Sequence, residues 1–221
     1  MQKLSDREIR EQIVEISKTM YSKGLVNAFE GNVSYFDGKN IYMTPSQVCK
    51  GLLKEDMLVV IDMDGKIIKT KDGYVPSSEY KMHLACYRLR PDIKSVVHTH
   101  SPYATAYALA GKPITTKAYP EVLILYGQIP LSKYGTPSTD DIYAGFADVI
   151  KDRYEVFLIE NHGIISMGKD LTETYLKIEA AENIAKVLTI TNQIGGEKQL
   201  PEDELIVLQG MREAFLKSKT D

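Results

Sequence analysis

The sequence has few cysteines, no long apolar run and no basic stretch, and each absence excludes a class of protein. Only two cysteines occur, Cys49 and Cys86, and their positions match neither a CxxC motif nor another metal-binding pattern. We therefore expect two reduced thiols in a cytoplasmic protein rather than a disulfide. No apolar run approaches the length of a membrane span, and the first residues lack an apolar signal core, so we expect no membrane insertion. The net charge is −3 and there is no basic cluster, so the sequence lacks the positive patch by which proteins bind nucleic acid.

The first third of the chain predicts one helix followed by antiparallel sheet. Ser5 and Glu8 form a capping box, and apolar residues at helical spacing continue from there to a stop at Gly24. Alternating segments then predict strands, which turns at Asp37-Gly38 and Asp64-Gly65 join into hairpins. The predicted strands are residues 33–36, 41–43, 58–62 and 66–68.

The remaining sequence alternates between apolar strands and helical segments. Ser77 or Ser78 is expected to cap a helix that stops at Pro91, with Glu79 in its first turn. Further strands are predicted at 93–100, 122–125 and 156–159, and further helices at 102–110, 138–151, 171–194 and 202–217. We therefore predict a single domain over residues 1–221, an α/β/α sandwich around a central, mostly antiparallel sheet. The Gly195-Gly196 pair is expected to make 195–221 a mobile tail that closes over the site.

Three of the four histidines stand where strands are predicted to end. His98 and His100 are two residues apart on one strand, so they face the same side and can hold one ion. His162 ends a separate buried strand. Three neutral imidazoles with an open fourth position are typical of a catalytic divalent site, with zinc the leading candidate, although polar residues packed at strand ends are the alternative. His83, inside a helix, is better explained as a core histidine or one that supports the site.

Glu79 and its neighbours also have two interpretations. A glutamate near a helix start is commonly a surface charge that complements the helix dipole, but beside the histidines Glu79 would be a general base. Ser77, Ser78 and the Gly31-Asn32 turn are either ordinary caps and turns or groups that offer hydroxyls and amides to a phosphate. Residue spacing alone leaves both interpretations open.

Five short motifs, taken in order, resemble those of the class II aldolase/ribulose-phosphate 4-epimerase family over nearly the whole chain. They are Gly31-Asn32-Val33-Ser34, Thr44-Pro45-Ser46, Ser77-Ser78-Glu79 followed by His83, His98-Thr99-His100, and Asn161-His162-Gly163. The resemblance implies that His98, His100 and His162 hold Zn²⁺, with Glu79 at the same centre as the proton-transfer group. It also implies a cradle for the substrate phosphate made by six residues: Gly31, Asn32, Ser46, Gln47, Ser77 and Ser78.

The activity implied by this resemblance is the reversible, zinc-dependent cleavage of a short ketose 1-phosphate to dihydroxyacetone phosphate and a small aldehyde such as lactaldehyde. The family places a tyrosine from a neighbouring subunit near the aldehyde oxygen; Tyr119 matches it, and a homotetramer with sites at subunit interfaces is implied. Glutamate at position 79 favours an aldolase, because the epimerases carry aspartate there. A pentulose-phosphate 4-epimerase and a methylthioribulose-1-phosphate dehydratase are alternatives, and a non-catalytic module like the adducin head is a third.

Three residues depart from the family pattern. Gln47 replaces the glycine of the usual Thr-Pro-Ser/Thr-Gly loop. Glu30 brings negative charge towards the expected phosphate site, where it either points away or contacts a substrate hydroxyl. Phe215 is the nearest match to a tyrosine of the family's C-terminal tail, which leaves L-fuculose 1-phosphate and smaller deoxyketoses, such as 5-deoxyribulose 1-phosphate, as substrates.

Overall fold

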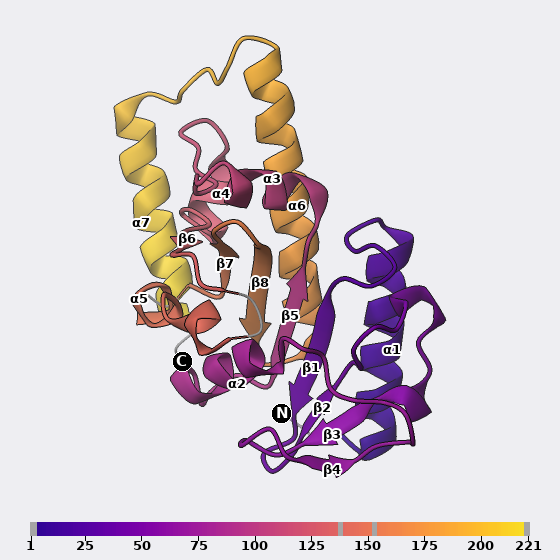
Figure 1. The fold of residues 1–221 in the computed structure, drawn as a ribbon. Helices are drawn as coiled ribbons and strands as arrows, with labels where there is room; N and C mark the ends of the chain where they lie inside the picture. Colours follow the sequence, from indigo (N-terminus) through magenta and orange to yellow (C-terminus); the bar gives the residue numbers. More distant parts are fainter. Residues whose placement is uncertain (1–3, 137–138, 152–153, 219–221) are drawn as a thin grey trace.

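One mixed sheet runs through the middle of the molecule (Figure 1). The computed structural model describes residues 4–136, 139–151 and 154–218. Within these ranges the sheet has eight strands in the order β4-β3-β2-β1-β5-β8-β7-β6. Neighbouring strands pair antiparallel except β6 and β7, which are parallel. The strands are β1 Asn32–Phe36, β2 Ile41–Met43, β3 Val59–Ile61, β4 Ile67–Lys69, β5 Ser95–Thr99, β6 Leu131–Ser132, β7 Val156–Ile159 and β8 Gly163–Gly168.

Helices cover both faces of this sheet. Val96 and Val97 are consecutive on β5 and fully buried, yet they belong to different apolar clusters because side chains alternate along a strand. The cluster around Val97 includes side chains of α1 (Asp6–Ser22), α3 (Pro102–Leu109), α4 (Pro120–Leu125) and α6 (Leu171–Gln193). The cluster around Val96 includes side chains of α2 (Tyr80–Leu89) and α5 (Phe146–Lys151). The predicted α/β/α sandwich with a mostly antiparallel sheet is confirmed.

Two predicted elements are wrong in type or extent. Residues 122–125, predicted as a buried strand, belong to helix α4, whose first residue is Pro120. Val122 alone of these four residues is fully buried, and Leu125 is 46% exposed, so the run is not the predicted buried strand. The helix predicted over 138–151 is a short 3₁₀ helix, Asp140–Tyr143, followed by α5; Ser138, where the prediction begins, lies outside the described residues.

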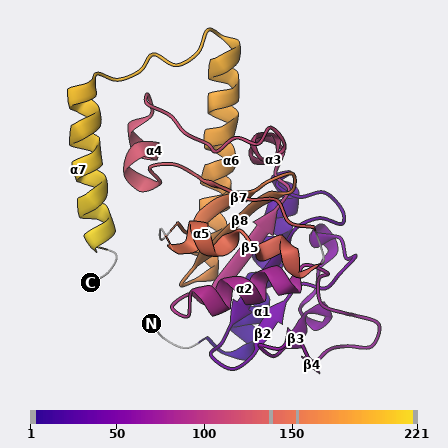
Figure 2. The same cartoon turned by 60° about the vertical axis from the view of Figure 1, so that its left-hand side comes forward.

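The C-terminal segment lies against α4. Figures 1 and 2 both show α7 (Glu202–Ser218) beside this short helix, at the end of a long connection from α6. Arg212 donates a 3.3 Å hydrogen bond to the Ile124 carbonyl, and the Leu200 amide donates one of 2.9 Å to the Lys117 carbonyl. The last predicted helix is therefore confirmed and docked, although the structure does not test whether the segment moves.

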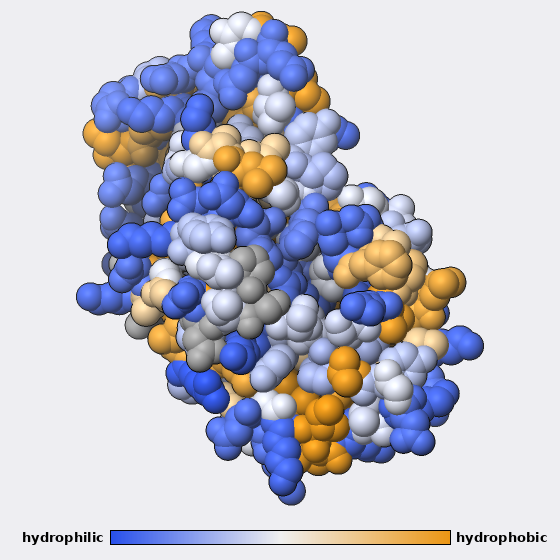
Figure 3. Space-filling model, in the orientation of Figure 1, coloured by the Kyte–Doolittle hydropathy of each residue, from blue (hydrophilic) through white to orange (hydrophobic). Residues whose placement is uncertain are grey.

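Hydrophobic side chains remain exposed on α7. Ile206, Val207 and Met211 are each at least half exposed, and Figure 3 shows a hydrophobic patch over the upper part of this helix on an otherwise mostly hydrophilic surface. None of the helices in the described ranges is both long and apolar enough to cross a bilayer.

Candidate metal centre and active site

Four side chains from distant parts of the chain converge on one point. Glu79 precedes α2, His98 lies on β5, His100 follows that strand, and His162 occupies the turn between β7 and β8. One ligand atom from each lies within 4.8 Å of those from the other three. The Nε2 atom of His162 is 3.1 Å from that of His98 and 3.3 Å from that of His100. The three predicted metal ligands and the predicted proton-transfer group therefore lie together.

The close approach of β5 and the β7–β8 turn depends on Gly163. A Cβ atom at this position would lie 2.6 Å from the Thr99 carbonyl oxygen and 2.9 Å from Cδ2 of His100. Any larger residue would push the turn away from the end of β5. Asn161, at the start of the same turn, has a φ of 55°, a left-handed conformation that asparagine tolerates better than most residues. The Asn-His-Gly motif therefore gives the turn the conformation that brings His162 close to the end of β5.

A hydrogen bond at the far ring nitrogen orients one imidazole, and a carboxylate lies behind a second. His98 Nδ1 donates a 2.9 Å hydrogen bond to the Ile164 carbonyl, which leaves the lone pair of Nε2 facing the cluster. Burial holds the pKa of His98 well below its usual range. His100 Nδ1 lies 3.4 Å from Oε1 of Glu30. Glu30 therefore points towards a candidate ligand, in the arrangement by which carboxylates orient metal-binding histidines.

These donors fit a metal ion. Ligands about 2.0–2.1 Å from a tetrahedral zinc ion lie about 3.3–3.4 Å apart, close to the separations of the Nε2 atoms. Imidazole nitrogens that face one another, beside a carboxylate, are a typical donor set for a divalent cation. The group of Glu79 and three histidines can therefore hold a metal.

Glu79 is an ionised, largely enclosed carboxylate rather than a surface charge. Its side chain is 14% exposed. Burial acts to raise the pKa of Glu79, but the opposing effects of His98, His162 and His100 are larger and lower it. Oε1 lies 2.7 Å from His162 Nε2, and Oε2 accepts a 2.7 Å hydrogen bond from Asn32 Nδ2.

Glu79 occupies the N-cap position of α2 instead of the first turn, because the helix begins at Tyr80. The Ser77 hydroxyl does not cap α2 as predicted; it accepts a 3.3 Å hydrogen bond from the Glu79 amide.

The six residues of the expected phosphate cradle come from three neighbouring segments. The Ser46 amide donates to the Val75 carbonyl at 3.0 Å, and the Ser77 amide donates to the Thr44 carbonyl at 3.2 Å, so the 44–47 loop lies beside the 75–78 segment. Ser77 is buried while Ser78 is exposed. Gly31 and Asn32 join this region through the hydrogen bond from Asn32 to Glu79.

Gln47 has a backbone conformation that residues other than glycine rarely adopt. Its φ is 55°, in the left-handed region that glycine adopts at little cost. The departure from the family pattern therefore adds a side chain to the loop at a position where glycine would be at ease.

Sequence reasoning missed several residues that support the site. Ser34 and Tyr87 connect to His83, which is fully buried and bonded to Asn32, so the expectation of a core or supporting role for His83 is confirmed. Lys50 has a fully buried side chain whose ammonium donates to the Val48 carbonyl at 3.0 Å. Only its position just after the Thr-Pro-Ser motif could have pointed to Lys50.

Tyr119 lies apart from the contacts of this cluster. It occupies the N-cap position of α4 and packs against the apolar cluster on that face of the sheet. Among the described residues, the polar contacts of Glu79 and the three histidines do not include Tyr119. Its predicted role across a subunit boundary stays a prediction.

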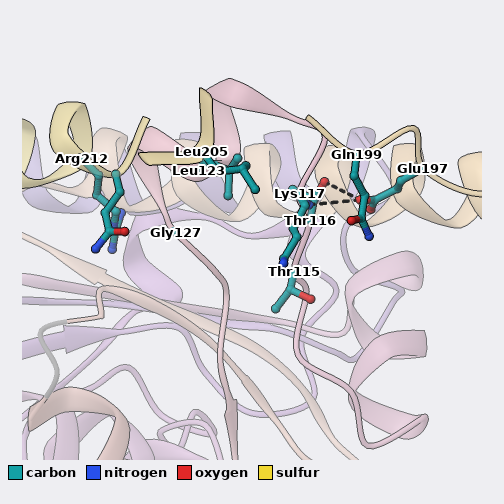
Figure 4. A pocket seen from close by; sticks show the side chains of 10 residues that line it. Thr115, Thr116, Lys117, Leu123, Gly127, Glu197, Gln199, Leu205 and Arg212 are labelled. Atoms are coloured by element: carbon teal, nitrogen blue, oxygen red, sulfur yellow. Dashed lines mark hydrogen bonds between the residues drawn. The ribbon is translucent and has the colours of Figure 1, made fainter. Parts of the chain in front are cut away.

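A cavity away from this cluster lies between the 115–117 segment, α4 and α7. This cavity measures about 520 Å³, and Figure 4 shows Arg212 and Leu123 on its walls, with Glu197 bonded to Thr116 and Lys117. None of its lining residues belongs to the histidine cluster.

Comparison with known proteins agrees with this geometry. An L-fuculose phosphate aldolase of Methanocaldococcus jannaschii is 37% identical over 187 residues, which cover 83% of this chain and 96% of the relative. A 5-deoxy-D-ribulose 1-phosphate aldolase of Bacillus thuringiensis is 36% identical, with 89% and 91% covered. A 3-oxo-tetronate 4-phosphate decarboxylase of Escherichia coli is 31% identical, with 84% and 88% covered.

A solved L-fuculose 1-phosphate aldolase structure superposes with a TM-score of 0.83 at 25% identity, covering 97% of this chain and 99% of that one. The profile of one family, described as class II aldolase and adducin N-terminal domain, matches residues 11–189. The chain therefore belongs to the class II aldolase and adducin N-terminal domain family, as an enzyme of the class II aldolase type.

Proposed function

We propose that this protein is a zinc-dependent aldolase that reversibly cleaves a short ketose 1-phosphate to dihydroxyacetone phosphate and a small aldehyde such as lactaldehyde. The observation that carries the proposal is the convergence of Glu79 with three histidines, one ligand atom from each lying within 4.8 Å of the others. L-Fuculose 1-phosphate and 5-deoxyribulose 1-phosphate are the leading substrates, because two relatives with more than 35% identity are named for such ketose phosphates.

His98, His100 and His162 would hold the zinc ion, since their Nε2 atoms face one another and two of the rings are oriented from behind. Zinc would supply Lewis-acid stabilisation of the negative charge that develops on the substrate oxygens when the C3–C4 bond breaks.

Glu79 would move the proton at C3. In the direction of synthesis the carboxylate removes a proton from C3 of dihydroxyacetone phosphate, and in the direction of cleavage it returns that proton. The lowered pKa keeps Glu79 ionised and therefore ready to act as a base. The Asn32 hydrogen bond holds Oε2, while Oε1 faces the histidine cluster, 2.7 Å from His162 Nε2, and would carry the proton.

The substrate phosphate would bind Gly31, Asn32, Ser46, Gln47, Ser77 and Ser78. Lys50 supports an anion site in this region. Its buried ammonium bonds to the Val48 carbonyl, two residues after Ser46, and it forms no ion pair with a carboxylate of the described residues. A buried cation without a counter-ion is costly, and a bound phosphate would offset that cost. Burial lowers the pKa of Lys50, while Cys49 and Glu79 act in the opposite direction.

Tyr119 would assist proton transfer at the aldehyde oxygen from a neighbouring subunit of a homotetramer. Exposed apolar side chains on α7 and at the end of α6 support an interface between copies, because such residues cluster where proteins associate. Light scattering would give the oligomeric state. Mixing Glu79→Gln with Tyr119→Phe subunits would test the shared site, since hybrid tetramers should regain activity that neither variant has alone.

The first experiment is to incubate the zinc-loaded protein with a panel of ketose 1-phosphates, with and without a chelator. Dihydroxyacetone phosphate and the aldehyde are measured together. Release of both in equal amounts, abolished by chelator and restored by zinc, is the expected result. The best substrate identifies the physiological aldehyde. Loss of the sugar phosphate without dihydroxyacetone phosphate would refute the aldolase and favour the epimerase or the dehydratase.

A decarboxylase is the second candidate, because one relative at 31% identity is named for that reaction. Loss of CO₂ from 3-oxo-tetronate 4-phosphate also gives dihydroxyacetone phosphate, so this product alone does not separate the two activities. Release of CO₂ from that acid, with no aldehyde from any ketose phosphate, would establish the decarboxylase. Absence of metal after purification without chelator would favour the non-catalytic module.

A further inference from the structure

Behind Glu79 lies a buried row of hydrogen-bonded side chains that the proposed reaction does not use directly. The Asn32 amide bonds to Glu79 Oε2 at 2.7 Å and, on its other side, to His83 Nε2. His83 Nδ1 lies 2.7 Å from Ser34 Oγ, which in turn lies 2.7 Å from the Tyr87 hydroxyl. Asn32, Ser34, His83 and Tyr87 are each at most 3% exposed. No solvent is therefore needed to complete the row.

The charge of Glu79 determines the direction of every hydrogen bond in this row. A carboxylate only accepts hydrogen bonds, so Asn32 must present its NH₂ group to Glu79 and its carbonyl oxygen to His83. His83 Nε2 must then donate. Burial lowers the pKa of His83 to about 4, although Glu79 acts in the opposite direction, so the ring carries one proton. That proton is on Nε2, and Nδ1 is an acceptor.

The same logic continues to the end of the row. Ser34 donates its only hydroxyl proton to His83 Nδ1, and its oxygen accepts the proton of Tyr87. The other acceptor within reach of Tyr87, the Lys94 carbonyl, is farther away at 3.5 Å. Reversing any one bond would leave two donors or two acceptors facing each other, and a reversed Asn32 would place its oxygen against the carboxylate.

We propose that His83 is a positioning residue that locks the Asn32 amide in the orientation that holds Oε2 of Glu79. This inference rests on the proposed role of Glu79 in proton transfer. The locked amide keeps one carboxylate oxygen engaged and directs the other towards the histidine cluster. With the amide in place, Oε1 lies 2.7 Å from His162 Nε2 while Oε2 stays 3.5 Å from His98 Nε2. Without it, Oε2 is free to move closer to the imidazoles, and Glu79 to act as a two-oxygen metal ligand instead of a base.

The test compares two substitutions of His83 with a control on the same helix. His83→Met removes both ring nitrogens, while His83→Gln keeps an amide N–H near the place of Nε2–H. Cys86→Ala disturbs the buried side of the same helix, because Cys86 is fully buried. It removes no hydrogen bond of the row, since Cys86 takes part in none of them. All three are measured as zinc-loaded protein for kcat, KM, zinc affinity and melting temperature.

We expect His83→Met to lower kcat about 10- to 100-fold, the rate equivalent of losing a hydrogen bond to a charged group, with KM within about threefold. His83→Gln should recover most of that loss, and Cys86→Ala should change kcat less than about twofold despite a lower melting temperature. An equal fall in kcat for Cys86→Ala would reduce His83 to a packing role, and unchanged kcat in folded His83→Met would overturn the proposal.

A second measurement needs no activity, and its deciding readout uses the wild-type protein. Nitrogen-15 NMR of histidine-labelled wild-type protein reports which ring nitrogen of His83 carries the proton. We expect the Nε2–H form in both metal-free and zinc-loaded protein, and a mixture of forms in Ser34→Ala, which removes the donor to Nδ1. An Nδ1–H ring in the wild type would refute the direction of the row. This result would stand whether or not any ketose phosphate proves to be a substrate.

Discussion

Asn32 on β1 lies directly across from His98 on β5 in the antiparallel sheet, and its side chain bonds to Glu79. One register position thus connects a candidate metal ligand with the candidate base. A slip of one residue in this pairing would turn Asn32 to the opposite face and separate the two. The centre therefore depends on strand register as much as on its own side chains.

Glu79→Gln tests proton transfer. The variant keeps the shape of the side chain and leaves three imidazoles in place, so we expect zinc content close to that of the wild type. Turnover should fall by about 10²- to 10⁴-fold, the usual contribution of a general acid or base. Rapid-mixing measurement of dihydroxyacetone phosphate formation, beside metal analysis of the same sample, gives both numbers. A variant that stays active would refute the role of Glu79.

His162→Ala tests metal binding. Removing one of three ligands should weaken zinc binding by at least about 100-fold, since loss of a group that merely orients a ligand costs about 10- to 100-fold. Calorimetric zinc titration of metal-free protein measures the change. His83→Gln is the matched control, because His83 is a buried histidine outside the cluster. Equal zinc affinity in His162→Ala and wild type would exclude His162 as a ligand.

Lys50→Met tests the buried cation. Methionine nearly matches the length of lysine but cannot pair with phosphate, so KM for the ketose phosphate should rise about 10- to 100-fold, as for loss of a charge-assisted contact. Zinc affinity should not change. Lys54→Met, an exposed lysine in the same segment, should leave KM unaltered. If inorganic phosphate inhibits Lys50→Met as strongly as it inhibits the wild type, Lys50 does not bind the phosphate.

Gly163→Ala tests the close approach at the β7–β8 turn. The added methyl would lie 2.6 Å from the Thr99 carbonyl, so we expect a loss of about 1–3 kcal/mol in the free energy of unfolding and weaker zinc binding. Gly210→Ala is the control, because nothing lies within 4 Å of a Cβ there and the glycine is inside α7. That substitution should be neutral or stabilising by up to about 1 kcal/mol. Urea denaturation measures both.

Acidification should destabilise the metal-free protein partly through His83. Its pKa is about 4 in the folded protein, lowered by burial from an ordinary 6.5. Between these values the unfolded chain binds a proton that the folded chain does not, so the free energy of unfolding falls as pH falls from 6.5 to 4. The full contribution is about 3 kcal/mol. Urea denaturation across this range, for wild type and His83→Gln, should give curves that converge at low pH. Parallel curves would show that His83 does not titrate as described.

The sequence was sufficient to predict that the histidines lie together, but not to predict which residues contact them. His98 and His100 could be paired because strand periodicity puts them on one face, and the structure places their rings 4.9 Å apart. The contacts of Glu30 with His100 and of Asn32 with Glu79 join residues far apart in sequence. No local pattern encodes such contacts.

Local ambiguity explains the errors in the fold prediction. Residues 122–125 read as a strand because four apolar residues in a row fit a buried strand and a short helix equally well. The preceding Pro120 was the better signal, since proline favours the first position of a helix.

Glu79, His98, His100 and His162 come from separate segments of the chain, and this affects when the centre forms during folding. The residues before β7 contain Glu79, His98 and His100 but lack the last imidazole, so no N-terminal fragment that stops there carries the whole set. A binding site absent from the unfolded chain adds its affinity to the stability of the folded one. The chain can offer its metal a full set of donors only when β8 has paired with β5, so metal capture would report the completion of folding.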